Sequence, residues 1–182
     1  NGQLCTAGIR TKEIDQQFAK NAPTDHQLAT QWCWAASISM VFAFHGHRIA
    51  QDEIVERIKG IRINQPAQGF EISKALSRTW ADEDGDKFRS KCRVWDWMGG
   101  RFEISNNDII DELRKDRPLV YGARGHATVL TSIDYVKNAW GSVAVVGANV
   151  RDPWPSSGGK RRLRIEELSP IYVAAVRINE IE

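Results

Sequence analysis

Sulfur-containing residues are scarce in this chain of 182 residues, which has three cysteines and two methionines. An odd number of cysteines cannot all pair with one another, so the sequence excludes a dense disulfide framework. If Cys33 is the free thiol, Cys5 and Cys92 could form a disulfide, which would indicate an oxidising compartment. They could equally remain unpaired, and the sequence leaves both alternatives open.

Long hydrophobic runs are also missing. No stretch approaches the roughly 20 apolar residues of a membrane-spanning helix, so we expect no membrane span. The first five residues have neither the charged nor the apolar region of a signal peptide. Because the chain begins with Asn1 rather than methionine, a targeting segment or pro-segment could already have been removed.

The chain carries no large excess of charge of either sign. Its 25 lysines and arginines nearly balance 23 aspartates and glutamates, for a net charge of +2, which does not indicate a nucleic-acid partner. One basic run, residues 160–164, is followed at once by Glu166 and Glu167. We expect it to form a solvated loop or a strand edge, with a docking patch for an acidic partner as the alternative.

Motifs for common cofactors are absent. The sequence contains no phosphate-binding P-loop, no G-x-G-x-x-G fingerprint and no G-x-S-x-G elbow. His45 and His47, with His26 and Cys92 elsewhere, match no familiar metal-ligand spacing. We therefore expect neither a metal nor another cofactor.

The first half of the chain has the periodicity of helices. The run from Cys33 to about Phe44 is apolar almost all round and predicts a buried helix. Helical spacing and end signals predict further helices over 12–20, 51–59, 70–80 and 106–115. The charged, glycine-containing stretch 82–91 predicts an exposed turn.

The second half changes to short β-branched runs. These predict strands over 119–123, 127–135, 142–150 and 171–178, while residues 92–103 are irregular or strand-like. The predicted fold is a single α+β domain over residues 1–182 with two facing halves. We expect a helical subdomain over about 12–116 and an antiparallel β subdomain over about 117–182.

The most distinctive chemistry is a cysteine that begins the predicted buried helix. A thiol attacks as its thiolate, which the positive end of a helix and an adjacent imidazolium both stabilise. Cys33 has the first of these, and His126, at the start of a predicted strand, could supply the second.

A catalytic imidazole needs a partner that fixes its orientation. If His126 opens one strand of a hairpin, Asp152 closes the return strand at the same edge of the sheet. Asn149 and Asn138 are rivals, but Asn138 falls in the turn at the opposite end. For the oxyanion, the backbone N–H of Cys33 and the side-chain amide of Gln27 are candidate donors, with Gln31 as a weaker alternative.

Taken together, these motifs resemble the papain-like cysteine peptidases. The resemblance is to their compact bacterial branch, which includes avirulence-type effector peptidases and the leader-cleaving domains of bacteriocin exporters. It spans about residues 22 to 155 and rests on three segments, Gln27-x5-Cys33-Trp34, Arg117-Pro118 leading to Gly125-His126, and Asp152-Pro153-Trp154.

The resemblance implies that Cys33 is the nucleophile, His126 the general base, Asp152 the orienting residue and Gln27 the oxyanion donor. It also implies substrate contacts at Trp32, Gly69, Arg124 and Gly125. The larger papain-type enzymes differ in having a cysteine at the position of Thr30 and an asparagine as third catalytic residue. The exporter peptidases are followed by membrane spans that this chain lacks, which favours a free-standing effector or secreted type.

The expected function is therefore a papain-like thiol endopeptidase that cleaves proteins or peptides through an acyl-enzyme. We expect a monomer that is secreted or delivered into a target cell, and the sequence leaves open whether a pro-segment or a partner activates it. The alternative is an acyl-transfer, deamidase or transglutaminase-like toxin with the same triad. A cell-wall amidopeptidase and a non-catalytic binding module fit the same residues less well.

Overall fold

The computed structural model describes residues 2–10, 12, 26–157 and 159–182 of the chain. Its helices are α2 (Cys33–Phe44), α3 (Gln51–Lys59), α4 (Gly69–Ala75) and α5 (Asn106–Arg114), with 3-10 helices η1 (Pro155–Ser157) and η2 (Ile165–Leu168). Its strands are β1 (Leu4–Gly8), β2 (Thr79–Ala81), β3 (Lys87–Asp96), β4 (Arg101–Phe102), β5 (Leu119–Ala123), β6 (His126–Lys137), β7 (Val143–Arg151), β8 (Lys160–Arg162) and β9 (Tyr172–Glu180). The α+β class predicted from the sequence is confirmed.

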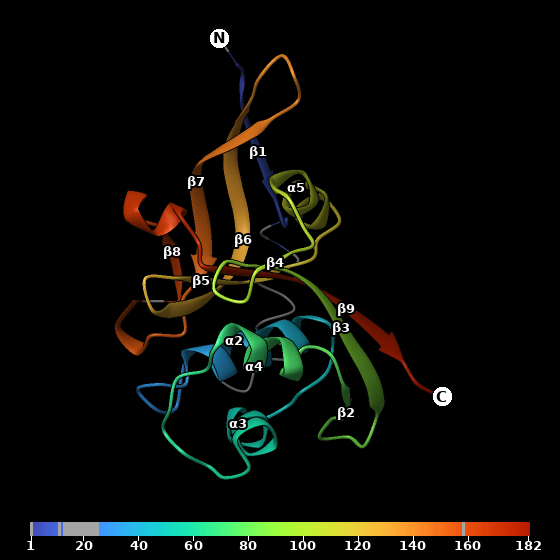
Figure 1. Cartoon of the computed structure of the whole chain (residues 1–182). Coiled ribbons are helices and arrows are strands. Elements are labelled where there is room, and N and C mark those ends of the chain that lie inside the picture. The colour runs from blue at the N-terminus through green and yellow to red at the C-terminus, as the bar shows by residue number, and fades with distance from the viewer. Residues whose placement is uncertain (1, 11, 13–25, 158) are drawn as a thin grey trace.

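Within the described residues, nine strands form one sheet in the order β2-β3-β9-β5-β6-β7-β8, with β1 paired to β6 and β4 paired to β3. All of these neighbours run antiparallel. The long β6–β7 hairpin extends away from the helices α2, α3 and α4 (Figure 1). The sheet thus joins strands from both halves of the sequence, and β8 lies at its edge.

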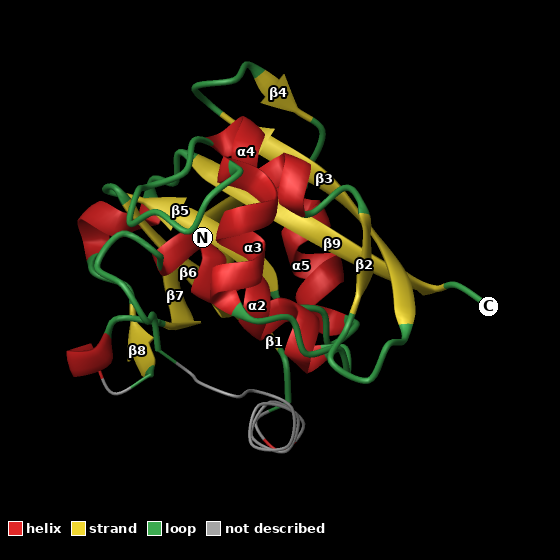
Figure 2. Cartoon of the chain, turned by 90° about the horizontal axis from the view of Figure 1, so that it is seen from below, coloured by secondary structure: helices red, strands yellow, loops and turns green. Residues whose placement is uncertain are grey.

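Helices cover both faces of this sheet (Figure 2). On one face, Phe42 of α2 packs against Phe88 of β3, and Ser73 of α4 hydrogen bonds to Tyr172 of β9. The next residue along β9, Val173, points to the opposite face, where it lines a cavity together with Ile109 of α5. The sheet therefore separates α2 and α4 from α5.

Helix α2 is the centre of the core, and every residue from Trp34 to Phe44 is buried, as the all-round apolar run predicts. Helix α5 begins at a capping box, in which Ser105 and Asp108 satisfy each other's backbone N–H groups. None of the helices in the described part of the chain is long and apolar enough to cross a membrane.

Two predictions around Trp80 are wrong. The helix predicted over 70–80 ends at Ala75, because the Trp80 indole turns back and donates to the Ala75 carbonyl oxygen at 3.0 Å. Trp80 lies instead in β2, where it pairs with Phe88. The turn predicted over 82–91 contains the first half of β3, whose charged and buried residues alternate.

The N-terminal segment contributes a strand that the sequence analysis does not predict, since β1 pairs with β6 from Leu4 to Gly8. The alternative of a disulfide between Cys5 and Cys92 is wrong, because both thiols are free. Cys5 lies opposite Tyr135 in β6, whereas the Cys92 sulfur contacts the Ser77 hydroxyl oxygen at 3.2 Å. The helix predicted over 12–20 falls outside the described residues, apart from Lys12.

Candidate active site

Cys33 is the first residue of α2, so its thiol lies at the positive end of the helix. The residues on either side pin this end against the loop that precedes α4. The Trp32 indole donates to the Ile63 carbonyl oxygen at 2.9 Å, and the Trp34 indole donates to the Gln65 carbonyl oxygen at 3.1 Å. These bonds hold the half-buried Cys33 thiol in a defined place.

His126 is presented by a tight hairpin between β5 and β6. Only Arg124 and Gly125 separate the paired residues Ala123 and His126. Both have positive φ angles, +55° and +74°, which are those of a two-residue hairpin turn of the right twist. Because this turn is tight, it holds the imidazole of His126 in a defined position at one end of the sheet.

Asp152 follows β7 directly and meets His126 at the same end of the sheet. Its Oδ1 lies 2.6 Å from His126 Nε2, and the residue is 3% exposed. The rival Asn138 lies at the opposite end of this hairpin, where its Oδ1 accepts the N–H groups of Trp140 and Ser142. The other rival, Asn149, donates to Ser132 Oγ within the sheet. Because the β6–β7 ladder ends at Val129 and Arg151, the hairpin brings His126 and Asp152 to the same end of the sheet, within hydrogen-bond distance.

The Asp152 carboxylate is itself held by a second ion pair. Its Oδ2 accepts the Arg161 Nε–H at 2.6 Å, and the two terminal nitrogens of Arg161 lie 2.7 and 2.8 Å from the buried carboxylate of Glu167. The backbone N–H groups of Trp154 and Arg164 donate to Asp152 and Glu167 respectively. Four groups of alternating charge thus run inward from His126.

This arrangement changes the protonation of the His126–Asp152 pair. Burial disfavours the imidazolium, but hydrogen bonds with Asp152 and Cys33 outweigh it and raise the pKa of His126 to about 9. Burial also disfavours the aspartate anion, but bonds from His126, the Trp154 N–H and Arg161 lower the pKa of Asp152 to about 2. At neutral pH the site can therefore hold a protonated imidazole between a thiol and a carboxylate.

A cleft of about 230 Å³ opens at Cys33 and His126. It brings together residues of both halves of the chain, and its walls include Gln31, Gly69, Asp96, Met98, Gly122, Gly125 and Tyr172. A side chain at Gly69 would collide with Asp96, since a Cβ there would lie 2.5 Å from Oδ2. At Gly125, by contrast, a Cβ would meet nothing within 4 Å, so this part of the wall leaves room for a polypeptide backbone to approach.

Comparison with known proteins identifies the kind of protein that carries this site. Residues 16–172 match the family described as "Papain-like cysteine protease AvrRpt2". The chain belongs to this family. It is therefore a cysteine peptidase, and the papain-like fold expected from the sequence is confirmed.

The solved structures to which the chain is similar are distant in sequence. One is a double glycine motif protease from an AMS/PCAT transporter in complex with its leader peptide, with 16% identity, a TM-score of 0.46, and 85% of this chain and 89% of that one covered. Another is UfSP from C. elegans, with 16% identity, a TM-score of 0.46, and 99% of this chain and 35% of that one covered. No curated protein sequence matches the chain.

In this member of the family, Gln27 does not point its amide into the cleft. Its Nε2 donates to the carbonyl oxygens of Ala29 and Thr30 at 2.9 and 2.8 Å, and its Oε1 is buried without a hydrogen-bond partner among the described residues. Donation to an oxyanion would require one of these two bonds to open. Gln31, the alternative from the sequence, does line the cleft.

The remaining predicted contacts are divided between the cleft and its surroundings. Gly69 and Gly125 line the cleft, whereas Trp32 is buried and supports the loop beside it. Arg124 lies next to the cleft, in a separate hollow that also contains His126. Arg161 and Glu167 are functional residues without a signal of their own in the sequence, since they lie in and just after the basic run 160–164, which is expected to form a solvated loop or a strand edge.

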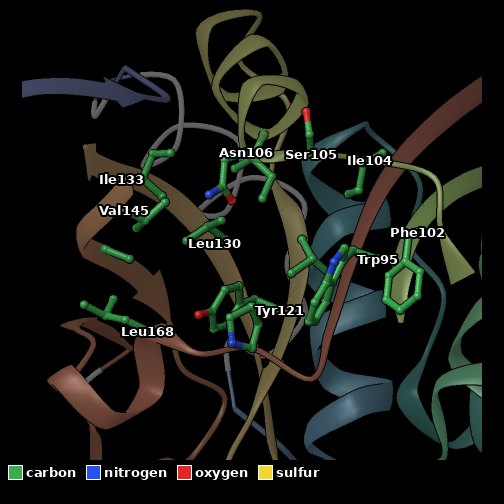
Figure 3. A pocket seen from close by; sticks show the side chains of 14 residues that line it. Trp95, Phe102, Ile104, Ser105, Asn106, Tyr121, Leu130, Ile133, Val145 and Leu168 are labelled. Atoms are coloured by element: carbon green, nitrogen blue, oxygen red, sulfur yellow. The ribbon is translucent and has the colours of Figure 1, made fainter. Parts of the chain in front are cut away.

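A larger, mostly apolar cavity of about 480 Å³ lies on the α5 side of the sheet. Figure 3 shows Tyr121, Leu130 and Trp95 pointing into it, with Asn106 and Ser105 at its upper rim. Neither Cys33 nor His126 lines it. As for metals, the described residues contain no group of three or more histidine, cysteine or acidic side chains that could hold an ion.

Proposed function

We propose that this cysteine peptidase is an endopeptidase whose catalytic triad is Cys33, His126 and Asp152. The observation that carries the proposal is the imidazole of His126, which lies 2.6 Å from the buried carboxylate of Asp152 and lines the same cleft as Cys33. In this mechanism the Cys33 thiolate attacks the scissile carbonyl, and the imidazolium gives its proton to the leaving amine. A water molecule activated by the neutral imidazole then hydrolyses the thioester.

The oxyanion of the tetrahedral intermediate needs donors near Cys33. The backbone N–H of Cys33, at the start of α2, is available for this role by its position. We propose that a side-chain amide assists it, either Gln31 from the cleft wall or Gln27 after one of its bonds opens. Family membership also supports a secreted or delivered effector role, which we propose on that ground alone.

The test of peptidase function combines thiol labelling with the mapping of new protein N-termini. We expect iodoacetamide to label Cys33 faster than Cys5 or Cys92, since burial raises the pKa of the Cys92 thiol. A proteome treated with the active protein should gain new N-termini that the alkylated protein does not produce. Equal labelling of the three cysteines, or amine adducts in place of new N-termini, would contradict a peptidase with Cys33 as nucleophile.

We also expect Arg161→Met to weaken catalysis through Asp152. Without the guanidinium, two buried carboxylates lose their shared partner, and the pKa of Asp152 rises because the ionised form is no longer stabilised. Residues that hold a catalytic group without touching the substrate typically contribute about tenfold or more. We therefore expect kcat/KM to fall by roughly tenfold. The loss should be greatest at acidic pH, where the Asp152 carboxylate of the variant becomes protonated.

Arg177→Met is the matched control for this prediction. Arg177 of β9 also donates to a buried carboxylate, that of Glu112 at 2.6 Å, and it lines neither the cleft nor the hollow beside His126. The control changes the net charge equally and should leave the pH profile unchanged. Identical profiles for the two variants would show that Arg161 does not act through Asp152. Circular dichroism of both variants identifies any loss of fold.

A further inference from the structure

A second hollow adjoins the cleft at His126, and we refer to it as the arginine recess. It has a volume of about 440 Å³. Its lining residues are His126, Asp152, Trp154, Glu167 and four arginines, Arg124, Arg161, Arg162 and Arg164. The lining thus holds four guanidinium groups and two carboxylates, and two further carboxylates outside it, those of Asp134 and Glu166, lie against Arg162 and Arg164.

The chemistry of acyl-enzyme formation determines which part of a substrate would reach this recess. The imidazolium of His126 protonates the leaving nitrogen, so the segment on the C-terminal side of the scissile bond must pass over the imidazole. His126 lines both the cleft and the arginine recess, whereas Cys33 lines only the cleft. A segment that leaves the cleft past His126 therefore enters the recess.

The four arginines differ in how far their charge is already neutralised. Arg161 is held between Asp152 and Glu167. Arg162 pairs with Asp134, and Arg164 lies 3.3 Å from Glu166. Arg124 is exposed and has no ion-pair or hydrogen-bond partner among the residues that the structure describes. The positive charge of Arg124 is therefore the one in the recess that is available to a ligand.

The backbone at Arg124 adds an independent observation. Its φ of +55° places it at the first position of the two-residue hairpin turn, where asparagine, aspartate and glycine are favoured. An arginine in this conformation is strained, and such strain tends to be kept where a side chain serves a function. The turn also places Arg124 only two residues before His126, with Gly125 between them.

We propose that the arginine recess binds acidic residues on the C-terminal side of the scissile bond, and that Arg124 selects them. The proposal rests on the endopeptidase function proposed above and names its substrate class: polypeptides with aspartate or glutamate shortly after the cleaved bond. The cleft itself, unlike the recess, is lined by a carboxylate, that of Asp96, and by no arginine or lysine among the described residues. An acidic residue on the N-terminal side of the cleaved bond would therefore meet a carboxylate and no guanidinium, and we expect no enrichment of acidic residues there.

The first part of the test identifies cleavage sites in a proteome-derived peptide library. The wild-type protein should produce new N-termini in which aspartate or glutamate is enriched within the first three residues. A synthetic substrate from this set is then compared with its partner in which asparagine replaces the aspartate. We expect kcat/KM to be about three- to fivefold higher for the aspartate peptide, and the ratio to shrink at 0.5 M salt.

The second part assigns the preference to Arg124. Arg124→Asn removes the charge and suits the turn, so the ratio of kcat/KM between the two peptides should fall to about one, whereas Arg124→Lys should keep most of it. Arg89→Asn is the matched control, because Arg89 is exposed on β3, seven residues from Asp96, and has no place in the recess. It changes the net charge equally and should keep the wild-type ratio.

The outcomes separate this proposal from the function on which it rests. Cleavage by the wild type with no preference for acidic residues would overturn the recess proposal alone, as would a preference that survives in Arg124→Asn. If the wild type cleaved no member of the library, the endopeptidase function and the recess proposal would both be refuted. A ratio that falls equally in Arg89→Asn would assign the effect to net charge rather than to the recess.

Discussion

Replacement of Cys33 by alanine should abolish peptide cleavage, with kcat/KM lower by roughly 10⁴-fold or more. Among the described residues that line the cleft with His126 there is no second cysteine and no serine or threonine, so no thioester or equivalent ester can form there. The fold should be unaffected, since Cys33 is only half-buried and alanine is a good helix former. Initial rates on a peptide substrate, together with thermal unfolding, would measure both effects.

Cys5→Ala is the control for the loss of a thiol at a different place. Cys5 lies in β1 opposite Tyr135, nine residues along β6 from His126, and should be dispensable for turnover. If Cys33→Ala retained substantial activity, the nucleophile would have to be sought elsewhere. If both variants lost activity with their folds intact, a redox role shared by the two thiols would replace the triad.

The second large effect is expected at Asp152. Asp152→Ala removes the hydrogen bond and the charge that stabilise the imidazolium, so kcat/KM should fall by about 10²–10⁴-fold. The pKa of His126, about 9 in the wild type, should fall as well. The imidazolium exists only below that pKa, so the alkaline limb of the pH–rate profile should move to lower pH in the variant. An unchanged alkaline limb would contradict the pairing of His126 with Asp152.

Asp152→Asn tests whether the amide of the larger papain-type enzymes can serve here. The two carboxylate oxygens face different donors, His126 on one side and Arg161 on the other. An asparagine can accept from only one of them, and its NH₂ group then faces an N–H of the other. We therefore expect Asp152→Asn to be less active than the wild type, and the further change Arg161→Met to recover part of the loss.

The sequence specified much of the site because its signals are local or follow from strand register. The apolar run after Cys33 predicts the buried helix, and a hairpin that begins at His126 brings Asp152 to the same edge. The alternation of charged and buried residues in β3 was also present in the sequence, but glycine and acidic residues just before it favoured a turn. A strand pattern there would have been the better interpretation.

Other features depend on contacts that no local pattern reveals. Trp80 has helical spacing with Leu76, yet its indole ends the helix and its backbone pairs with β3. The orientation of the Gln27 amide depends on two carbonyl groups in its own loop. Arg161 belongs to a basic run typical of a solvated segment, and only the tertiary fold turns this one arginine inward between two buried carboxylates.

The strand that carries Arg161, β8, is also one of the two end strands of the sheet as the structure describes it. An unpaired edge can recruit a strand from another molecule, and positively charged side chains along it oppose such pairing. All three residues of β8 are basic, and only the middle one turns toward Asp152. The same short strand therefore opposes aggregation and orients the catalytic carboxylate of Asp152. Substitutions that remove the positive charges of β8 would lower colloidal stability and turnover together.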